Sequence, residues 1–346
     1  MKYAVLFHPG HNRVYFETAL ALSVSEFAIV SQKLSAACTD VCRESIQGVD
    51  YLTFQTERAL TEADWRPVSA LSFVYALFEV ITMDGETVLK PLPRRRESFV
   101  DDGMSAMLKY TGKTNEIFTR MLINIAASSQ DNTGRLRLLD PIAGKGTTLF
   151  EGLARGYDVY GIEIGDAVVN EAYHFVKRYL ETARYKFDCA SIKISGPNKS
   201  FTAQRHTFTA ARTKEEMKAG GARTLELIAG NSAHAAVMHK KNFFNIIVGD
   251  LPYGVQHGNV TNEKQSAITR NPSQLLRACL PAWAAVLKPG GCMALSWNSN
   301  VLPRKQMEEL LAAQGFEALN DDAYASLAHR VDQAIVRDVI AARKKA

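Results

Sequence analysis

The chain has 346 residues, of which 47% are hydrophobic and 22% charged, and its formal net charge is +5. This length predicts two domains with a sizeable core, and the composition excludes a disordered or collagen-like chain. The five cysteines have no spacing typical of a disulfide framework or a zinc site, so we expect no bound metal. The sequence contains no apolar run long enough for a membrane span or a signal peptide, and we expect a cytoplasmic protein without membrane contact.

Residues 1–95 predict a small α+β domain. An apolar strand at 3–7 is followed by a helix at about 15–34, and further strand-like runs follow at 51–55, 71–81 and 87–92. Pro91, Pro93 and the three arginines at 94–96 then interrupt the pattern and predict a linker. We therefore expect a second domain over residues 96–346.

In the second domain, strands and helices alternate. The apolar positions from Ile117 to Ile125 predict one face of a helix capped by Thr114 or Asn115. Alternation of this kind predicts a parallel sheet, and therefore an α/β fold. We expect strands at 135–140, 158–164, 224–229, 243–248, 292–297 and 333–341, and helices at 147–155, 166–183, 273–287 and 304–314.

A basic insertion at 191–223 separates the second of these strands from the third. Residues 191–245 contain nine lysines and arginines against three acids, with histidines and phenylalanines between them. Cations bind phosphates and planar rings stack on bases, so this composition favours a polyanion-binding surface over a merely solvated insertion. The predicted RNA-binding residues are Lys193, Lys199, Arg205, Arg212, Lys214, Lys218 and Arg223.

A glycine loop follows the first strand of the second domain. The segment 138–148 reads LLDPIAGKGTT, so that an acid ends the strand and two glycines precede a helix. Glycines let the backbone approach a ligand closely, and the helix N-terminus offers free N–H groups. Glu163 ends the next strand, where a carboxylate suits the two ribose hydroxyls of a nucleoside cofactor. Lys145 lies between the glycines, which argues against a phosphate-binding P-loop.

A second acid ends the buried strand at 243–248. Residues 245–254 read NIIVGDLPYG, which places Asp250 before a turn that contains proline and tyrosine. In open α/β sheets, ligands bind at the carboxyl ends of the strands. We therefore expect Asp250 to lie in the same site as Asp140 and Glu163.

Together the two motifs resemble the D-P-x-x-G-x-G-T and [DNS]-P-P-[YFW] patterns of S-adenosylmethionine-dependent methyltransferases that act on exocyclic amines of nucleic-acid bases. The resemblance covers about 111–346. It implies a Rossmann-like class I methyltransferase domain with a seven-stranded, mostly parallel sheet, and S-adenosylmethionine as cofactor. The segment DLPYG looks like the D-[PLM]-P-[YF]-G form of the THUMP-associated tRNA guanine-N2 methyltransferases. Residues 3–27 are loosely similar to the ferredoxin-like N-terminal segment of that family.

The resemblance also implies roles for individual residues. The side chain of Asp250 and the carbonyl of Leu251 would accept the two N–H bonds of the amine, Pro252 would hold the turn, and Tyr253 would stack on the extruded base. Thr114 falls in a segment that closes over the methionine end of the cofactor. The implied cofactor residues are Thr114, Asp140, Pro141, Ala143, Gly144, Gly146, Thr147, Glu163, Ile164, Asn231, Ser232 and Asp250.

The substrate predicted in this way is guanine N2 of RNA, with tRNA favoured over ribosomal RNA. A sequence-specific DNA enzyme usually carries a large recognition domain, and the sequence has no segment of that size. The alternatives are an adenine-N6 methyltransferase of DNA or ribosomal RNA, and an inactive RNA-binding protein that kept the fold. A small activator subunit, as in some relatives, is a further candidate partner.

Overall fold

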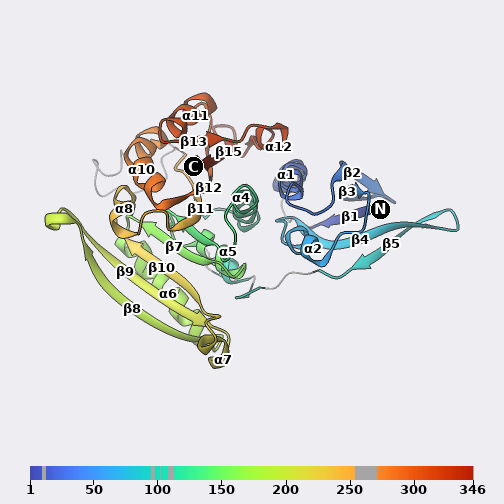
Figure 1. The fold of residues 1–346 in the computed structure, drawn as a ribbon. Helices are drawn as coiled ribbons and strands as arrows, with labels where there is room; N and C mark the ends of the chain where they lie inside the picture. The colour runs from blue at the N-terminus through green and yellow to red at the C-terminus, as the bar shows by residue number, and fades with distance from the viewer. Residues whose placement is uncertain (10–12, 95–97, 102, 108–112, 254–270, 346) are drawn as a thin grey trace. The chain divides into compact units, whose positions relative to one another are not determined.

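The computed structural model describes residues 1–9, 13–94, 98–101, 103–107, 113–253 and 271–345. The chain forms two compact units (Figure 1). The first comprises Met1–Glu97 and Asn320–Arg330, and the second comprises Ser98–Leu319 and Val331–Ala346. In the described part of the chain, we find no helix that is both long and apolar enough to cross a membrane.

The first unit is built around an antiparallel sheet with the order β2-β3-β1-β4-β5. The succession β-α-β-β-α-β in this order is the ferredoxin-like arrangement, which the sequence predicted, and β5 extends it by one strand. Strand β2 and helix α2 were not predicted. The elements are β1 (Lys2–Phe7), α1 (Arg13–Ser31), β2 (Cys38–Ile46), β3 (Val49–Thr56), α2 (Glu62–Ser69), β4 (Val74–Met83), β5 (Glu86–Leu92), α12 (Asp322–Ala325) and β14 (His329–Arg330).

The second unit contains a larger sheet with the strand order β13-β15-β12-β11-β6-β7-β10-β9-β8. Strands β12, β11, β6, β7 and β10 pair in parallel, and β15 runs antiparallel between β12 and β13. These seven strands form the predicted Rossmann-like methyltransferase sheet. Their bounds are β6 (Arg137–Asp140), β7 (Asp158–Glu163), β10 (Arg223–Ala229), β11 (Phe244–Asp250), β12 (Leu287–Asn298), β13 (Phe316–Ala318) and β15 (Val336–Lys344).

The helices of the second unit connect these strands. Asn115 caps α4, because its side chain accepts hydrogen bonds from the N–H groups of Ile117 and Phe118, as one of the two predicted caps. The helices are α3 (Met104–Met107), α4 (Glu116–Ser128), α5 (Thr147–Ala154), α6 (Asp166–Thr182), α7 (Lys214–Lys218), α8 (Ala235–Met238), α10 (Pro272–Val286) and α11 (Arg304–Ala312), with short 3-10 turns η1 (Pro197–Lys199) and η2 (Ser232–His234).

The basic insertion corrects the prediction in one respect. It is a regular β-hairpin made of β8 (Lys186–Ser195) and β9 (Thr202–Ala211), and it begins before residue 191 (Figure 1). Strand β9 pairs antiparallel with β10, so the insertion enlarges the sheet from seven strands to nine along its main order. Residues 288–291, expected to separate a helix from a strand, lie within β12, where its register against β11 shifts.

Candidate active site

Three carboxylates gather where neighbouring parallel strands end. Asp140 closes β6, Glu163 closes β7 and Asp250 closes β11. Burial raises the pKa of Asp140 to about 7; hydrogen bonds from Thr148 and Ile142 oppose the rise, and the charges of Glu163 and Asp250 add to it. The carboxyl edge of the sheet therefore carries concentrated negative charge, as the positions of the three acids in the sequence predicted.

The glycine loop turns tightly above this edge. Gly144 and Gly146 adopt left-handed backbone angles, with φ of +51° and +93°. The N–H of Gly144 donates to Oε2 of Glu163 at 3.0 Å, and the N–H of Gly165 donates to Oε1 at 2.9 Å. Apart from Gly144 and its two neighbours in the chain, no atom of the described residues lies within 4 Å of the position that a Cβ on Gly144 would take. The loop thus leaves open space over Gly144 and fixes the Glu163 carboxylate beside it.

Asp250 is held by hydroxyl groups from three elements. Oδ2 accepts a hydrogen bond from Oγ1 of Thr114 at 2.7 Å, and Oδ1 accepts short hydrogen bonds from the hydroxyls of Tyr253 and Ser296. The N–H of Leu251 donates to the carbonyl of Ser296 at 2.8 Å. A carboxylate oxygen can accept about two hydrogen bonds, so with the donors that the described residues supply, Oδ2 keeps one acceptor position.

Tyr253 is fixed in turn by residues from β12 and β15. Asn298 Nδ2 donates to the Tyr253 carbonyl at 3.4 Å. The guanidinium of Arg337 lies 4.3 Å from the ring centre of Phe118 and 5.1 Å from that of Tyr253. Burial and the neighbouring Asp250 raise the pKa of Tyr253 far above its usual range, against the opposing charge of Arg337, so the phenol stays protonated and can donate to Asp250.

Four of these residues were missed in the sequence: Phe118, Ser296, Asn298 and Arg337. Ser296 lies directly opposite Asp250 in the register of β11 and β12. The rule that polar residues at carboxyl strand ends form the site could have found Ser296 and Asn298. No local signal marks Arg337, which reaches the site from the antiparallel strand β15.

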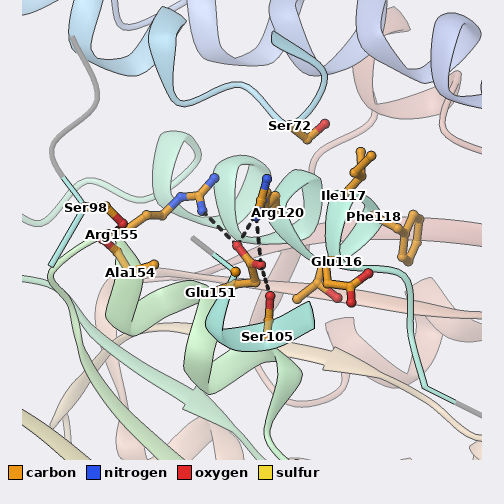
Figure 2. A network of polar contacts seen from close by, with 12 residues as sticks. Ser72, Ser98, Ser105, Glu116, Ile117, Phe118, Arg120, Glu151, Ala154 and Arg155 are labelled. Carbon is orange, nitrogen blue, oxygen red and sulfur yellow. Dashed lines mark hydrogen bonds and ion pairs between the residues drawn. The ribbon is translucent and has the colours of Figure 1, made fainter. Parts of the chain in front are cut away.

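A buried network of polar contacts on Glu151 connects α5 with α3 and α4 (Figure 2). Glu151 on α5 is 1% exposed and accepts hydrogen bonds from Arg120 Nε at 2.6 Å and from the hydroxyl of Ser105. The ammonium of Lys113 donates to the Ser105 carbonyl and to Glu116. Through these contacts, α5, which begins at the glycine loop, is tied to α3 and to the residue next to Thr114. The network fixes the segment that delivers the Thr114 hydroxyl to Asp250.

The remaining predicted cofactor residues occupy different surroundings. Pro141, Ala143 and Thr147 are buried in and beside the glycine loop, and Ile164 is 43% exposed. Asn231 is exposed and caps η2 through the N–H of Ala233 at 2.9 Å. Ser232 is buried, and its hydroxyl accepts a hydrogen bond from Trp283 Nε1 at 2.8 Å. The segment predicted to close over the cofactor begins at Thr111, and Thr111, Gly112 and Gly254 lie outside the described residues.

The predicted RNA-binding residues divide into two groups. Three arginines make contacts within the fold, and their assignment to RNA binding stays a prediction. Arg205 pairs with Glu226 at 3.4 Å and donates to the Met238 carbonyl. Arg212 and Arg223 donate to backbone carbonyls, and the bond from Arg223 Nε to the Gly156 carbonyl is 2.6 Å long. Both guanidinium groups lie over the ring of Phe99. Lys193, Lys199, Lys214 and Lys218 are exposed, and so is Arg212 in spite of its contacts.

Comparison of the chain with models of known protein families gave one match. The family model described as "RMKL-like, methyltransferase domain" matches residues 109–320. The search of the curated proteins found no match.

Solved structures with similar folds share little sequence with the chain. A 1,6-didemethyltoxoflavin-N1-methyltransferase of Burkholderia thailandensis, crystallised with S-adenosylhomocysteine, is 15% identical over 61% of this chain and 72% of its own, with a TM-score of 0.36. An rRNA methylase of Streptococcus thermophilus is 11% identical over 64% and 92%, with a TM-score of 0.34. A ribosomal protein L11 methylase of Lactobacillus delbrueckii is 14% identical over 67% and 81%, with a TM-score of 0.36. These likenesses are too low to decide a substrate.

The site fits S-adenosylmethionine on its own geometry. A sulfonium cation is stabilised by the negative charge of Asp140, Glu163 and Asp250. The open space over Gly144 admits a ligand that a side chain there would displace. Glu163 keeps acceptor positions for ribose hydroxyls besides its two backbone hydrogen bonds. Since the family model spans more than half of the sequence, the chain belongs to the RMKL-like methyltransferase-domain family and uses S-adenosylmethionine as its cofactor.

Proposed function

We propose that the protein methylates an exocyclic amine of a base in RNA, specifically N2 of a guanine in tRNA. The observation that carries this proposal is the state of Asp250. Hydroxyl groups of Tyr253, Ser296 and Thr114 hold its carboxylate from both sides, and one acceptor position on Oδ2 stays free. The Leu251 carbonyl, next in the chain, supplies a second acceptor.

Two acceptors are what an aromatic amine needs to become nucleophilic. Its lone pair is delocalised into the ring, and hydrogen bonds from both N–H groups to fixed acceptors draw the nitrogen out of conjugation. S-adenosylmethionine supplies an electrophilic methyl group when it is bound. Pro252 restricts the turn backbone, and the hydroxyls on Asp250 prevent its carboxylate from rotating, so the amine is held in one direction. Asp250 can afterwards take the proton that the product amine releases.

The choice of guanine rests on the chemistry of Asp250. An ionised carboxylate only accepts hydrogen bonds, whereas an asparagine both donates and accepts. Guanine carries a ring N–H beside its amino group, while adenine carries an acceptor nitrogen at that place. An acceptor-only side chain presents no N–H that would oppose the ring N–H of guanine, while the one remaining acceptor position of Oδ2 is taken by the amine. The DLPYG motif, which resembles that of tRNA guanine-N2 enzymes, supports the same choice and tRNA as the carrier.

The choice of RNA as substrate is supported by how easily a base can reach the site, as well as by the positive charge of the chain. A base must leave its stack to enter a pocket of this kind, which costs a few kcal/mol in a duplex and less in an unpaired loop. The ring of Tyr253 is the candidate stacking partner of the extruded base. The ferredoxin-like first unit is a candidate RNA-binding domain, and the exposed lysines of the second unit are candidate phosphate contacts.

The test is to incubate the purified protein with isotopically labelled S-adenosylmethionine and, separately, with undermethylated tRNA, ribosomal RNA or duplex DNA. Labelled nucleosides are then identified by mass spectrometry. We expect label in N2-methylguanosine from tRNA. Label in N6-methyladenine would overturn the choice of base, and label in DNA alone would overturn the choice of RNA. Cofactor binding without label in any nucleic acid would contradict the proposed activity.

A further inference from the structure

The β8–β9 hairpin carries positive charge in a segment of the chain that has no acidic residue after Asp188. No aspartate or glutamate occurs from Cys189 to Lys214, a segment that contains five lysines and arginines. Of these, Arg205 and Arg212 are engaged within the fold, as described above. Lys193 and Lys199 are exposed, and within the part of the chain that the structure describes, neither forms an ion pair. The two lysines are therefore available to a polyanion.

Strand register places these two lysines at the catalytic edge of the sheet. Glu163 pairs with Ala229, Ala229 pairs with Gln204, and Gln204 pairs with Lys193. Lys193 therefore stands in the same crosswise row as Glu163. The hairpin continues beyond this row through the turn that contains Lys199 and returns at Thr202. We call residues 193–202 the hairpin tip, and it extends past the end of β10 on the side where Asp250 lies.

The lysines of α7 lie at the opposite edge. Ala210 of β9 pairs with Arg223, the first residue of β10, and α7 follows just after β9 ends. Ten residues of extended strand span about 30 Å. Lys214 and Lys218 are thus separated from the hairpin tip by the length of the hairpin, and Figure 1 shows α7 at the far end from the β8–β9 turn.

The hairpin tip also carries an aromatic contact. The ring of Phe201 stacks on that of His234, with centroids 4.1 Å apart and an interplanar angle of 5°. His234 belongs to η2, directly after the end of β10. This stack holds the two rings against each other, so the lysines beside it are the groups that the hairpin tip offers to a polyanion. The same contact fixes the turn against the catalytic edge.

We propose that the hairpin tip, through Lys193 and Lys199, binds phosphates of the RNA strand that flanks the target nucleotide, and that the lysines of α7 do not. This inference rests on the proposed RNA methylation. Lys193 on β8 stands five strand positions from β11, which corresponds to about 24 Å from Asp250 across the sheet. A single nucleotide in the pocket cannot span that separation. The contact therefore acts only on a polymer and contributes to binding, not to the chemical step.

The experiment compares two double charge reversals. K193E/K199E changes the hairpin tip, and K214E/K218E makes the same change of charge at the opposite edge. RNA affinity is measured against salt concentration with an unmethylated tRNA transcript, and methyl transfer is measured as KM and kcat for the same transcript. S-adenosylhomocysteine binding to each variant checks that the cofactor site is intact.

We expect K193E/K199E to weaken RNA binding at least tenfold and to flatten the slope of log K against log salt by about 1.4, because each lost contact to a single strand removes about 0.7. KM for RNA should rise and kcat should change little. K214E/K218E should behave as wild type. Equal effects of the two variants, or a kcat loss in the first, would overturn the inference. A wild-type protein that binds cofactor yet methylates no RNA would instead overturn the proposed function.

Discussion

The two edges of the parallel sheet use charge in opposite ways. At the amino edge, where β7 and β10 begin, charged side chains bind other groups of the same domain. Arg223 donates to the Gly156 carbonyl, and Arg135 pairs with Asp158 at 2.5 Å. At the carboxyl edge, Asp140, Glu163 and Asp250 lie together, and no ion pair joins any of them to a cation among the described residues. A charge that is paired with an opposite charge of the fold stabilises the protein, whereas a hydrogen-bonded carboxylate without a cationic partner is available to a cationic ligand.

The same contrast separates the arginines of the basic insertion from its lysines. The insertion has a strong excess of lysine and arginine, yet its arginines bind backbone carbonyls and aromatic rings of the same domain. Arginine has a planar fork of donors and stacks well on rings, so it is suited to structural contacts that lysine makes less often. The lysines remain exposed.

The largest effect should come from the carboxyl edge. Replacement of Asp250 by alanine removes one of the two acceptors of the amine, and we expect kcat to fall by about a thousandfold, within the range for general-base and positioning groups. Cofactor affinity should change much less. The control is D188A, which removes an exposed aspartate of β8. Turnover of D250A within a few-fold of D188A would refute the assigned role.

At the amino edge we expect a substitution to lower stability and to leave function largely unchanged. Arg223→Ala removes hydrogen bonds to the carbonyls of Gly156, Gly221 and Ala222, together with the contact to the Phe99 ring. The free energy of unfolding should fall by about 2 kcal/mol, the scale of hydrogen bonds to a charged group. Urea denaturation measures this loss. RNA affinity of the folded variant should stay near wild type, and a large drop would return Arg223 to the RNA-binding surface.

The smallest effect concerns pH. Burial raises the pKa of Asp140 from 3.8 to about 7, so the ligand-free protein should lose stability as the pH rises through this interval, because the unfolded chain releases a proton that the folded protein still holds. A sulfonium cation favours the ionised form. Affinity for S-adenosylmethionine should therefore increase with pH up to about 7, by at most about tenfold per pH unit.

S-adenosylhomocysteine, which lacks the cationic charge, provides the comparison, and calorimetric titration from pH 5.5 to 8 measures both ligands. Its affinity should depend less on pH than that of the cofactor. Asp140→Asn should remove the difference between the two profiles. Parallel profiles in the wild-type protein would show that Asp140 does not titrate in this range.

Much of the fold could be predicted because helices and strands are marked by residues close together in the sequence. Periodicity places α6 and β10 within one residue of their predicted bounds, and Asn115 is a recognisable cap. Strands β2 and β8 were missed because both are edge strands whose exposed faces carry polar residues, so neither shows apolar alternation. The sheet order then depends on tertiary pairing, which only the resemblance to a methyltransferase supplied.

The residues of the candidate site also divide into those that a local sequence pattern marks and those that it does not. Asp140, Glu163 and Asp250 could be found because each directly follows an apolar strand. Ser296 and Arg337 belong to the same pocket but come from strands 46 and 87 residues after Asp250, and their neighbours in sequence give no sign of it. A residue that positions another across the sheet is visible only once the register is known.

The hairpin also protects the sheet it enlarges. Leu225, Leu227 and Ile228 of β10 are buried, and β9 satisfies the outer backbone groups of that strand. A version of the protein trimmed back to a short loop would end in a bare, apolar strand able to pair with another molecule. Strand β8 instead offers Lys186, Asp188 and Lys193 at the boundary. Engineering of substrate range is therefore best confined to the turn between β8 and β9, where residues can be exchanged without exposing a strand edge that could pair with another molecule.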